Sequence, residues 1–207
     1  IRGMKKSLID YAANLGLKNL SISTEDTTVD IVKRIRDYLI RNGATKQFIG
    51  KVMKELNKIM DEFEIENVES AKAINGARET LKEIKALGLK IGVLTRSCET
   101  YCKRALKITG MLQFIDAIEA REDLLAAKPN PTSLLNLCLK MSVKPKDVIF
   151  IGDHPLDMEC ASNAEVYFIG VTNKPERQRL LKKKGCKLIL KELREVLPII
   201  KGRFGLH

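Results

Sequence analysis

Two patterns of apolar positions divide this sequence near residue 71. In the first part, apolar residues recur every three or four positions, which predicts amphipathic helices. The repeats are Met4, Leu8, Tyr11 and Leu15, then Ile31, Ile35 and Leu39, then Phe48, Val52, Leu56 and Ile59. Gly16 and Gly43 are expected stops, and Thr27 with Asp30 forms a start that resembles a capping box. We therefore expect residues 1–71 to form a small, all-helical domain.

From Ala77 onward, helical stretches alternate with short runs rich in β-branched residues, which is typical of strand–helix–strand units with a parallel sheet. The expected strands are residues 90–94, 114–118, 148–151, 166–169 and 187–189. The expected helices are residues 78–87, 99–107, 131–141, 156–164, 176–184 and 193–200. The run VIFI at 148–151 is apolar throughout, which predicts a central strand covered on both faces. Residues 72–207 are thus predicted to be an α/β domain, a parallel sheet flanked by helices.

The composition changes this picture little. The chain has 207 residues, of which 44% are hydrophobic and 30% charged, as in globular proteins. No run approaches the roughly 20 apolar residues of a membrane span, and the opening residues do not resemble a secretion signal. The five cysteines are odd in number and form no C-x-x-C pair, so we expect reduced thiols. We expect a cytoplasmic protein that does not bind membranes.

The net charge of +11 comes from the C-terminal part of the chain. Residues 174–207 carry 11 Lys and Arg against 3 Asp and Glu. Such a segment could bind a polyanion, but no aromatic residue for base stacking lies between Arg177 and Lys187. A solvated helix face is the favoured interpretation, and we do not expect nucleic acid to be the partner.

The first candidate site residues follow the expected strand at 90–94. In open α/β sheets, ligands bind beyond the carboxyl ends of the strands. Thr95, Arg96 and Ser97 stand at this position and offer two hydroxyls and a cation, which suit an oxyanion. Threonine and serine also occur at strand ends for turn formation alone. The sequence leaves both interpretations open.

A carboxylate pair follows the expected strand at 148–151. Asp153 comes at the tip of this strand, and Asp157 follows four residues later near the start of the next helix. Both carboxylates could therefore face one point, and their hard oxygens suit Mg²⁺. The alternative is that Asp153 only caps the helix, which would account for one carboxylate but not readily for both.

A lysine completes the set of candidates. Lys128 lies in the loop AAKPNP at 126–131, where two prolines restrict the backbone before a helix, and could stand opposite the carboxylate pair. The two histidines, His154 and His207, have no nucleophile in a motif context, so triad catalysis loses support. Walker-type and dinucleotide glycine patterns are absent.

Three segments in this order resemble motifs two, three and four of the haloacid dehalogenase superfamily, in its phosphoglycolate-phosphatase-like branch with a helical cap. They are GARETLKEIKALGLKIGVLTRS, AKPNPTSLLNLCLKM and VIFIGDHPLDMECASNA. The resemblance implies a Rossmann-like core at 72–207, with residues 1–71 as the cap. It implies that Thr95 binds phosphate and that Lys128 steadies phosphate and nucleophile. It also implies that Asp153 is a Mg²⁺ ligand, and that Asp157 holds the metal shell or Lys128 in place.

The activity that the resemblance implies is Mg²⁺-dependent hydrolysis of a small phosphorylated metabolite through an aspartyl-phosphate. The family's first motif, a strand ending in Asp-x-Asp-Gly-Thr, does not occur in this sequence. We expect it within about 10–20 residues upstream of Ile1, and we expect the chain without it to fold poorly and to be inactive. Two further departures are Arg96, where the family usually has Asn, and Glu165, where it often has Gly.

Two other functions stay open at this point. One is a different chemistry on the same fold, namely phosphonate cleavage, sugar-phosphate mutation or dehalogenation. The aspartate pair at 153 and 157 favours metal-dependent phosphoryl chemistry over dehalogenation, which needs no Mg²⁺. The other is a binding protein that has lost its nucleophile, which the coding sequence upstream of Ile1 would reveal. The sequence does not indicate an oligomeric state.

Overall fold

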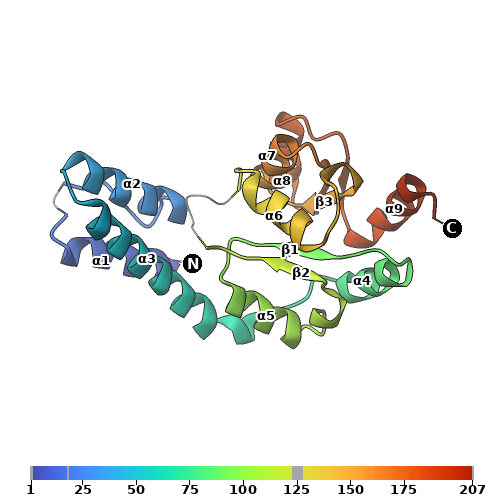
Figure 1. Cartoon of the computed structure of the whole chain (residues 1–207), viewed down its shortest axis with the longest axis horizontal. Helices are drawn as coiled ribbons and strands as arrows, with labels where there is room; N and C mark the ends of the chain where they lie inside the picture. The colour runs from blue at the N-terminus through green and yellow to red at the C-terminus, as the bar shows by residue number, and fades with distance from the viewer. Residues whose placement is uncertain (1, 18, 123–127, 207) are drawn as a thin grey trace. The chain divides into compact units, whose positions relative to one another are not determined.

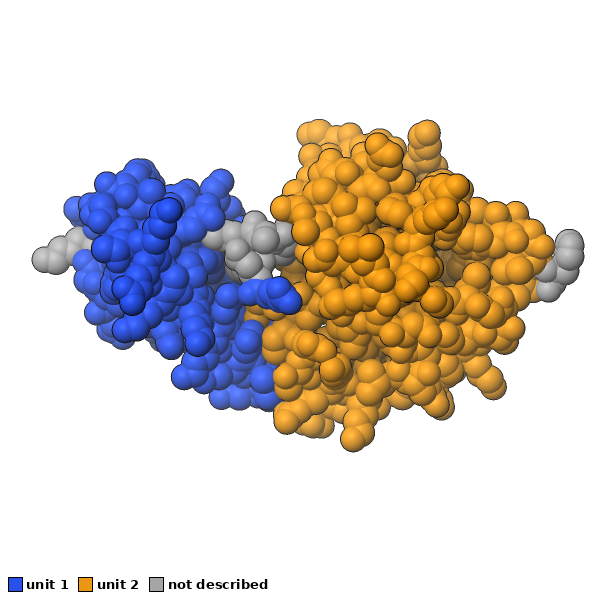
Figure 2. All heavy atoms as spheres, viewed as in Figure 1, with its two compact units in different colours: residues 1–68, 122–125 blue, residues 69–121, 126–207 orange. Residues whose placement is uncertain are grey.

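The computed structural model describes residues 2–17, 19–122 and 128–206, and its chain forms two compact units (Figure 2). Unit 1 comprises residues 1–68 and 122–125, and unit 2 comprises residues 69–121 and 126–207. Compactness alone does not show that a part of a chain folds independently. The division into a cap at 1–71 and a core at 72–207 therefore stays a prediction.

Unit 1 is helical in its described residues. Its helices are α1 (Arg2–Asn14), α2 (Thr28–Arg41) and α3 (Lys46–Glu66), and the short 3₁₀ helix η1 (Val68–Ser70) follows them. Each helix contributes one apolar stripe to a shared core, in which Leu8, Ile35 and Leu56 are fully buried. The Thr27 cap is confirmed, since its hydroxyl accepts from the Asp30 amide at 3.1 Å. The Asp30 carboxylate accepts from this hydroxyl at 2.6 Å, so the reciprocal bond of a capping box to the Thr27 amide is not formed.

Unit 2 alternates strands and helices (Figure 1). Its strands are β1 (Gly92–Leu94), β2 (Ala117–Glu119), β3 (Ile149–Gly152), β4 (Tyr167–Val171) and β5 (Ile189–Leu190). Its α-helices are α4 (Ala77–Ala86), α5 (Glu99–Ile108), α6 (Thr132–Lys140), α7 (Pro155–Asn163), α8 (Pro175–Lys183) and α9 (Val196–Phe204). Its short 3₁₀ helices are η2 (Leu112–Phe114), η4 (Pro145–Asp147) and η5 (Leu193–Glu195).

All strand pairs in the described part of unit 2 are parallel, but they form two separate pieces of sheet. One piece is β1 beside β2, with Val93 opposite Ile118. The other has the order β3-β4-β5, with Phe150 opposite Phe168 and Gly170 opposite Ile189. Every strand-to-strand connection within a piece passes through helical structure, as parallel pairing requires.

Two apolar clusters join both pieces of sheet into one three-layer unit. Leu94 of β1 and Phe150 of β3 pack in the same cluster, against α6 and α7. Residues of the opposite parity, among them Ile149 and Ile151, pack in the second cluster, which contains α4 and α9. The alternation follows the period of two of a β-strand. The predicted α/β fold, a parallel sheet flanked by helices, is therefore observed.

Both faces of VIFI are covered, as predicted: Val148 and Phe150 pack in the first cluster, and Ile149 and Ile151 pack in the second. The strand is not central among the described residues, because β3 pairs with β4 along one edge and has no described strand partner along the other, and residues 148–151 are only half-buried. Strand boundaries also differ from the expected ones: Phe114 ends the 3₁₀ helix η2, and Lys187 precedes β5. None of the described helices has the length and apolar character that a bilayer crossing requires.

Candidate active site

The carboxyl end of β1 places Thr95, Arg96 and Ser97 in a tight turn before α5. The Thr95 amide donates to the Glu119 carbonyl at 2.9 Å, and the Thr95 hydroxyl accepts from the Ser97 amide at 3.1 Å. The turn role that the sequence left open is thus real. Because a hydroxyl is one donor with two lone pairs, Thr95 still has its proton to offer to a ligand oxygen.

The carboxyl end of β3 leads directly into α7. His154 is the N-cap: its Nδ1 accepts from the Leu156 amide at 3.1 Å. The Asp157 Oδ2 completes the capping box by accepting from the His154 amide at 3.1 Å. Gly152 makes this possible, since a Cβ at that position would lie 2.6 Å from the Cβ of Asp157. The carboxylate that caps this helix is therefore Asp157, whereas the sequence suggested Asp153.

Asp157 also holds the lysine of the proline-containing loop. Its Oδ1 lies 2.6 Å from the Lys128 Nζ, and the two side chains are only 10% and 12% exposed. The Lys128 ammonium is also 5.8 Å from the centre of the Phe150 ring. Ala126 and Ala127 of the predicted loop lie outside the described residues. Lys128 is thus a largely desolvated cation held beside the tip of β3.

Asp153 has a different environment from Asp157. Its side chain is 57% exposed, and its Oδ2 lies 3.7 Å from Arg177 Nη1 near the start of α8. The nearby His154 is affected by these charges: burial lowers its pKa below the ordinary value of 6.5, and Arg177 adds to this effect, while Asp157 and Asp153 oppose it. A neutral imidazole agrees with the role of Nδ1 as a hydrogen-bond acceptor.

Arg96 links the two strand tips electrostatically. Burial lowers the pKa of its guanidinium, the negative charge of Asp157 opposes that shift, and the neighbouring Arg121 adds to it. His154 also feels the charge of Arg96. Arg96 and Asp157 are therefore close enough for their charges to interact, as expected of residues that follow the carboxyl ends of parallel strands. Thr95 and Ser97 share the turn of Arg96, whereas Lys128 and Asp157 pair beside the tip of β3, and Asp153 follows that strand.

Of the two aspartates after β3, only one is well suited to bind a hard divalent cation. Asp153 is exposed and its carboxylate has a single, long ion pair, so it can turn to a metal. Both oxygens of Asp157 already accept short hydrogen bonds. Among the described residues of unit 2, no three carboxylate, histidine or cysteine side chains converge on one point. Asp153 is therefore a suitable Mg²⁺ ligand, and Asp157 fits the role of holding Lys128.

Arg121 and Arg177 are site residues that sequence reasoning missed. Arg121 follows β2, and its Nη1 donates to the Arg96 carbonyl at 2.7 Å. Arg177 lies in the basic segment that the sequence analysis treated as a solvated face. The signal in the sequence was that each arginine follows an expected strand: Arg121 follows the strand at 114–118, and Arg177 follows the strand at 166–169.

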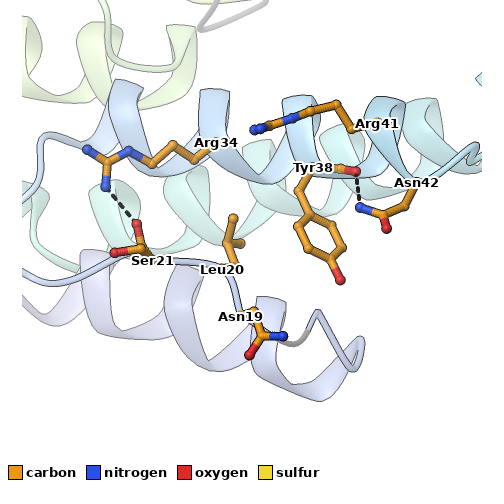
Figure 3. Close-up of a pocket in the computed structure, with 7 residues that line it drawn as sticks. All are labelled: Asn19, Leu20, Ser21, Arg34, Tyr38, Arg41 and Asn42. Carbon is orange, nitrogen blue, oxygen red and sulfur yellow. Dashed lines mark hydrogen bonds between the residues drawn. The ribbon is translucent and has the colours of Figure 1, made fainter.

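A cavity of about 680 Å³ lies in unit 1 (Figure 3). It is lined by Asn19, Leu20, Ser21, Arg34, Tyr38, Arg41 and Asn42. Arg34 Nη1 donates to the Ser21 carbonyl at 2.6 Å, and Arg41 Nε donates to the Asp37 carbonyl at 3.2 Å. No predicted site residue lines this cavity. In the sequence, the spacing of residues 34, 38 and 41 already indicates that these side chains lie on one face of a helix.

The fold and the polar residues at its strand ends define an α/β protein whose site lies at the carboxyl edge of a parallel sheet, where open sheets bind ligands. The family is also clear. The chain belongs to the haloacid dehalogenase-like hydrolases, whose family model matches residues 7–171.

Individual relatives match a shorter part of the chain. Validoxylamine A 7'-phosphate phosphatase of Streptomyces hygroscopicus subsp. limoneus is 28% identical over 127 residues, which are 61% of this chain and 58% of the relative. Phosphoglycolate phosphatase of Nitrosospira multiformis is 26% identical over 129 residues, which are 62% of this chain and 57% of the relative. The chain thus spans less than two thirds of the length of these curated relatives.

A solved structure supports the fold over nearly the whole chain. The β-phosphoglucomutase of Clostridium difficile has a TM-score of 0.68 with 17% identity, and the match covers 99% of this chain and 91% of that one. At this identity the likeness concerns the fold and not the reaction. The fold that it shows agrees with the family to which the chain belongs.

Proposed function

We propose that the protein containing this chain is a Mg²⁺-dependent phosphomonoester hydrolase that acts on a small phosphorylated metabolite. The observation that carries the proposal is the desolvated Lys128–Asp157 pair, which lies next to an exposed carboxylate, Asp153, at the carboxyl edge of the sheet. The matching relatives named above are phosphatases, which supports the same reaction class.

The described residues supply the groups that a phosphoryl transfer needs. Negative charge on the transferring phosphoryl group must be neutralised in the transition state. The Lys128 ammonium would face the phosphoryl oxygens, because Asp157 fixes its position and the surrounding protein excludes water from it. The Thr95 hydroxyl would donate to one of these oxygens while its lone pair keeps the amide of Ser97. Ser97 would add a donor at the same strand tip.

Asp153 would hold Mg²⁺, which supplies positive charge against the phosphoryl oxygens when bound. The attacking carboxylate is not among the residues of this site. We place it on a further strand beside β3, whose second edge has no partner among the described residues, and we propose that it forms an aspartyl-phosphate. A second carboxylate of that strand would protonate the leaving oxygen and then activate water.

The test is the Asp153→Asn variant of the full-length protein, assayed on a panel of phosphate esters with and without a chelator. We expect turnover by the variant to fall by about 100-fold or more, because the amide is a poor Mg²⁺ ligand. Calorimetry should show weaker Mg²⁺ binding by the variant. Asp147→Asn in the exposed 3₁₀ helix η4 is the matched control and should change neither quantity.

Two outcomes would contradict the proposal. Turnover by the wild-type protein that a chelator does not reduce would exclude the metal role. Phosphate binding without turnover of any ester would favour a binding protein on the same fold.

A further inference from the structure

Arg96 is a half-buried cation without an acceptor of its own. Its guanidinium makes no hydrogen bond and no ion pair with any residue in the described ranges 2–17, 19–122 and 128–206. Partial burial removes some of the water around this charge, and a paired anion would offset that loss. The guanidinium donors of Arg96 are therefore available to an anionic ligand.

The backbone around Arg96 is fixed while its side chain stays available. Arg121 Nη1 donates to the Arg96 carbonyl at 2.7 Å, and the Arg121 amide donates to the Ser97 carbonyl at 3.0 Å. These two bonds tie the turn after β1 to the residues after β2. Such support places a binding side chain before the ligand arrives, which lowers the entropy lost on binding.

The carboxylate whose charge acts on Arg96 is already engaged. Asp157 pairs with Lys128 and accepts from the His154 amide. In the proposed function, Lys128 and Thr95 serve the transferred phosphoryl group. The charge of Arg96 is additional to that set.

We propose that Arg96 binds a second anionic group of the substrate. The preferred substrates would then be phosphate esters or anhydrides with a carboxylate or a second phosphate close to the reacting phosphorus. A guanidinium presents paired N–H donors that match the paired oxygens of either group. This inference rests on the proposed function and adds the class of substrate to it.

The experiment compares three probes in the full-length protein with Mg²⁺. Phosphoglycolate carries a carboxylate, pyrophosphate carries a second phosphate, and methyl phosphate carries neither. We expect Arg96→Asn to lower the ratio of kcat/KM between the preferred anionic probe and methyl phosphate by about 10- to 100-fold, because a charge-assisted bidentate contact is lost. Arg96→Lys should lower the ratio less, since it keeps the charge but not the paired donors.

Arg194→Gln is the matched control, because Arg194 is an exposed arginine of the same unit and pairs only with Glu192 in the described structure. It should leave the ratio unchanged. A larger fall of kcat/KM for phosphoglycolate in Arg96→Asn would identify the second anion as a carboxylate. A larger fall for pyrophosphate would identify it as a phosphate. Equal losses for all three probes would overturn the inference, because Arg96 would then serve the transferred phosphoryl group or an upstream carboxylate. That result would leave the proposed function intact.

If the wild-type protein turns over neither these probes nor any ester of the panel, the proposed function fails and binding decides the inference separately. Calorimetry would compare phosphoglycolate and pyrophosphate with inorganic phosphate. Tighter binding of a probe with two anionic groups, lost in Arg96→Asn, would support the inference. Equal affinities for all three, unchanged in the variant, would overturn it.

Discussion

Lys128 and Asp157 lie 29 positions apart in the sequence, but their charged atoms are 2.6 Å apart in a largely buried site. Removal of one partner from such a pair leaves the other charge desolvated and alone, which costs more than the pair contributes. Asp157 has a second task as the capping residue of α7, so its position is fixed from two sides.

We predict that substitutions of these two residues are strongly non-additive. Lys128→Met and Asp157→Asn should each lower phosphate-ester turnover by about 10²- to 10³-fold, and the double variant should be little worse than either one. A double-mutant cycle on kcat/KM measures the coupling, which we expect to exceed about 1 kcal/mol.

The exposed pair of Lys103 and Glu99, also at 2.6 Å, is the matched control, and its coupling should stay below about 0.5 kcal/mol. Additive losses at Lys128 and Asp157 would show that the two residues act independently.

The site could be predicted from the sequence only where a local pattern carries it. The tips of β1 and β3 follow apolar runs, so Thr95 and the two aspartates could be placed at one edge. The different roles of Asp153 and Asp157 could not be predicted, because they depend on Gly152, which allows Asp157 to pack against the strand. Arg177 was also missed, because only tertiary packing brings α8 to the tip of β3.

At the scale of single elements, the end of α7 shows a local strain. Glu165 follows the C-cap Ala164 and has a φ of 55°, the left-handed conformation that glycine adopts most easily. Its amide still makes a turn bond to the Ser162 carbonyl at 3.2 Å. A glycine at this position would adopt the same conformation without a Cβ clash.

We predict that Glu165→Gly stabilises the protein by about 0.5–1 kcal/mol, because the loss of Cβ strain exceeds the entropy that glycine adds to the unfolded chain. Urea unfolding would measure the change. Glu165→Gln removes the charge but keeps the Cβ, so it should have nearly no effect. A destabilised glycine variant would mean that this backbone strain is not significant.

The start of β1 depends on a carboxylate from the residue before β2. Asp116 accepts from the Ile91 amide at 2.6 Å and from the Lys85 ammonium at 2.8 Å. Burial acts to raise the pKa of Asp116, but the Lys85 and Ile91 hydrogen bonds and the charges of Lys85 and Lys90 hold that pKa below its ordinary value. The carboxylate thus connects α4, β1 and β2.

We predict that Asp116→Asn costs about 1 kcal/mol of unfolding free energy at pH 7, a modest value because a third of the side chain is exposed. Since the folded pKa lies below the unfolded one, this stabilisation is present above about pH 4 and is lost as the pH falls further. The difference between variant and wild type should therefore shrink at pH 3 in urea unfolding. A difference that does not depend on pH would exclude the charge as its cause.

The elements themselves could largely be predicted, because every expected helix and strand has a counterpart at nearly the same residues. The errors fall at strand ends such as Phe114, where a 3₁₀ turn replaces extended backbone. Apolar pattern alone does not distinguish such a turn from a strand. The covering of both faces of VIFI could be predicted, but not the strand pairing along the two edges of β3, because an apolar run does not specify its neighbours.

At the scale of the whole molecule, the net charge of +11 is the property that most readily suggests a wrong partner. Part of the C-terminal excess is already used within unit 2: Lys184 pairs with Glu159 at 2.6 Å, and Arg177 pairs with Asp153. The remaining cations of α8 lie on an exposed helix without aromatic neighbours.

We predict weak binding to duplex DNA that fades steeply as salt rises, because such contacts are limited to phosphates. Fluorescence anisotropy with two unrelated duplexes, at about 50 and 200 mM salt, would measure it. The two duplexes should bind equally. A clear preference for one sequence at the higher salt would reverse this conclusion.

The edge of β3 that has no strand partner among the described residues has a consequence for how this chain behaves at high concentration. Its amides and carbonyls on that side can pair with any extended backbone, and the strand itself is apolar and uncharged. Natural sheets protect such edges with lysine, proline or a bulge, and VIFI has none of these. Edge-to-edge association between copies, leading to aggregates with cross-β character, is therefore the failure mode to expect whenever this edge is uncovered.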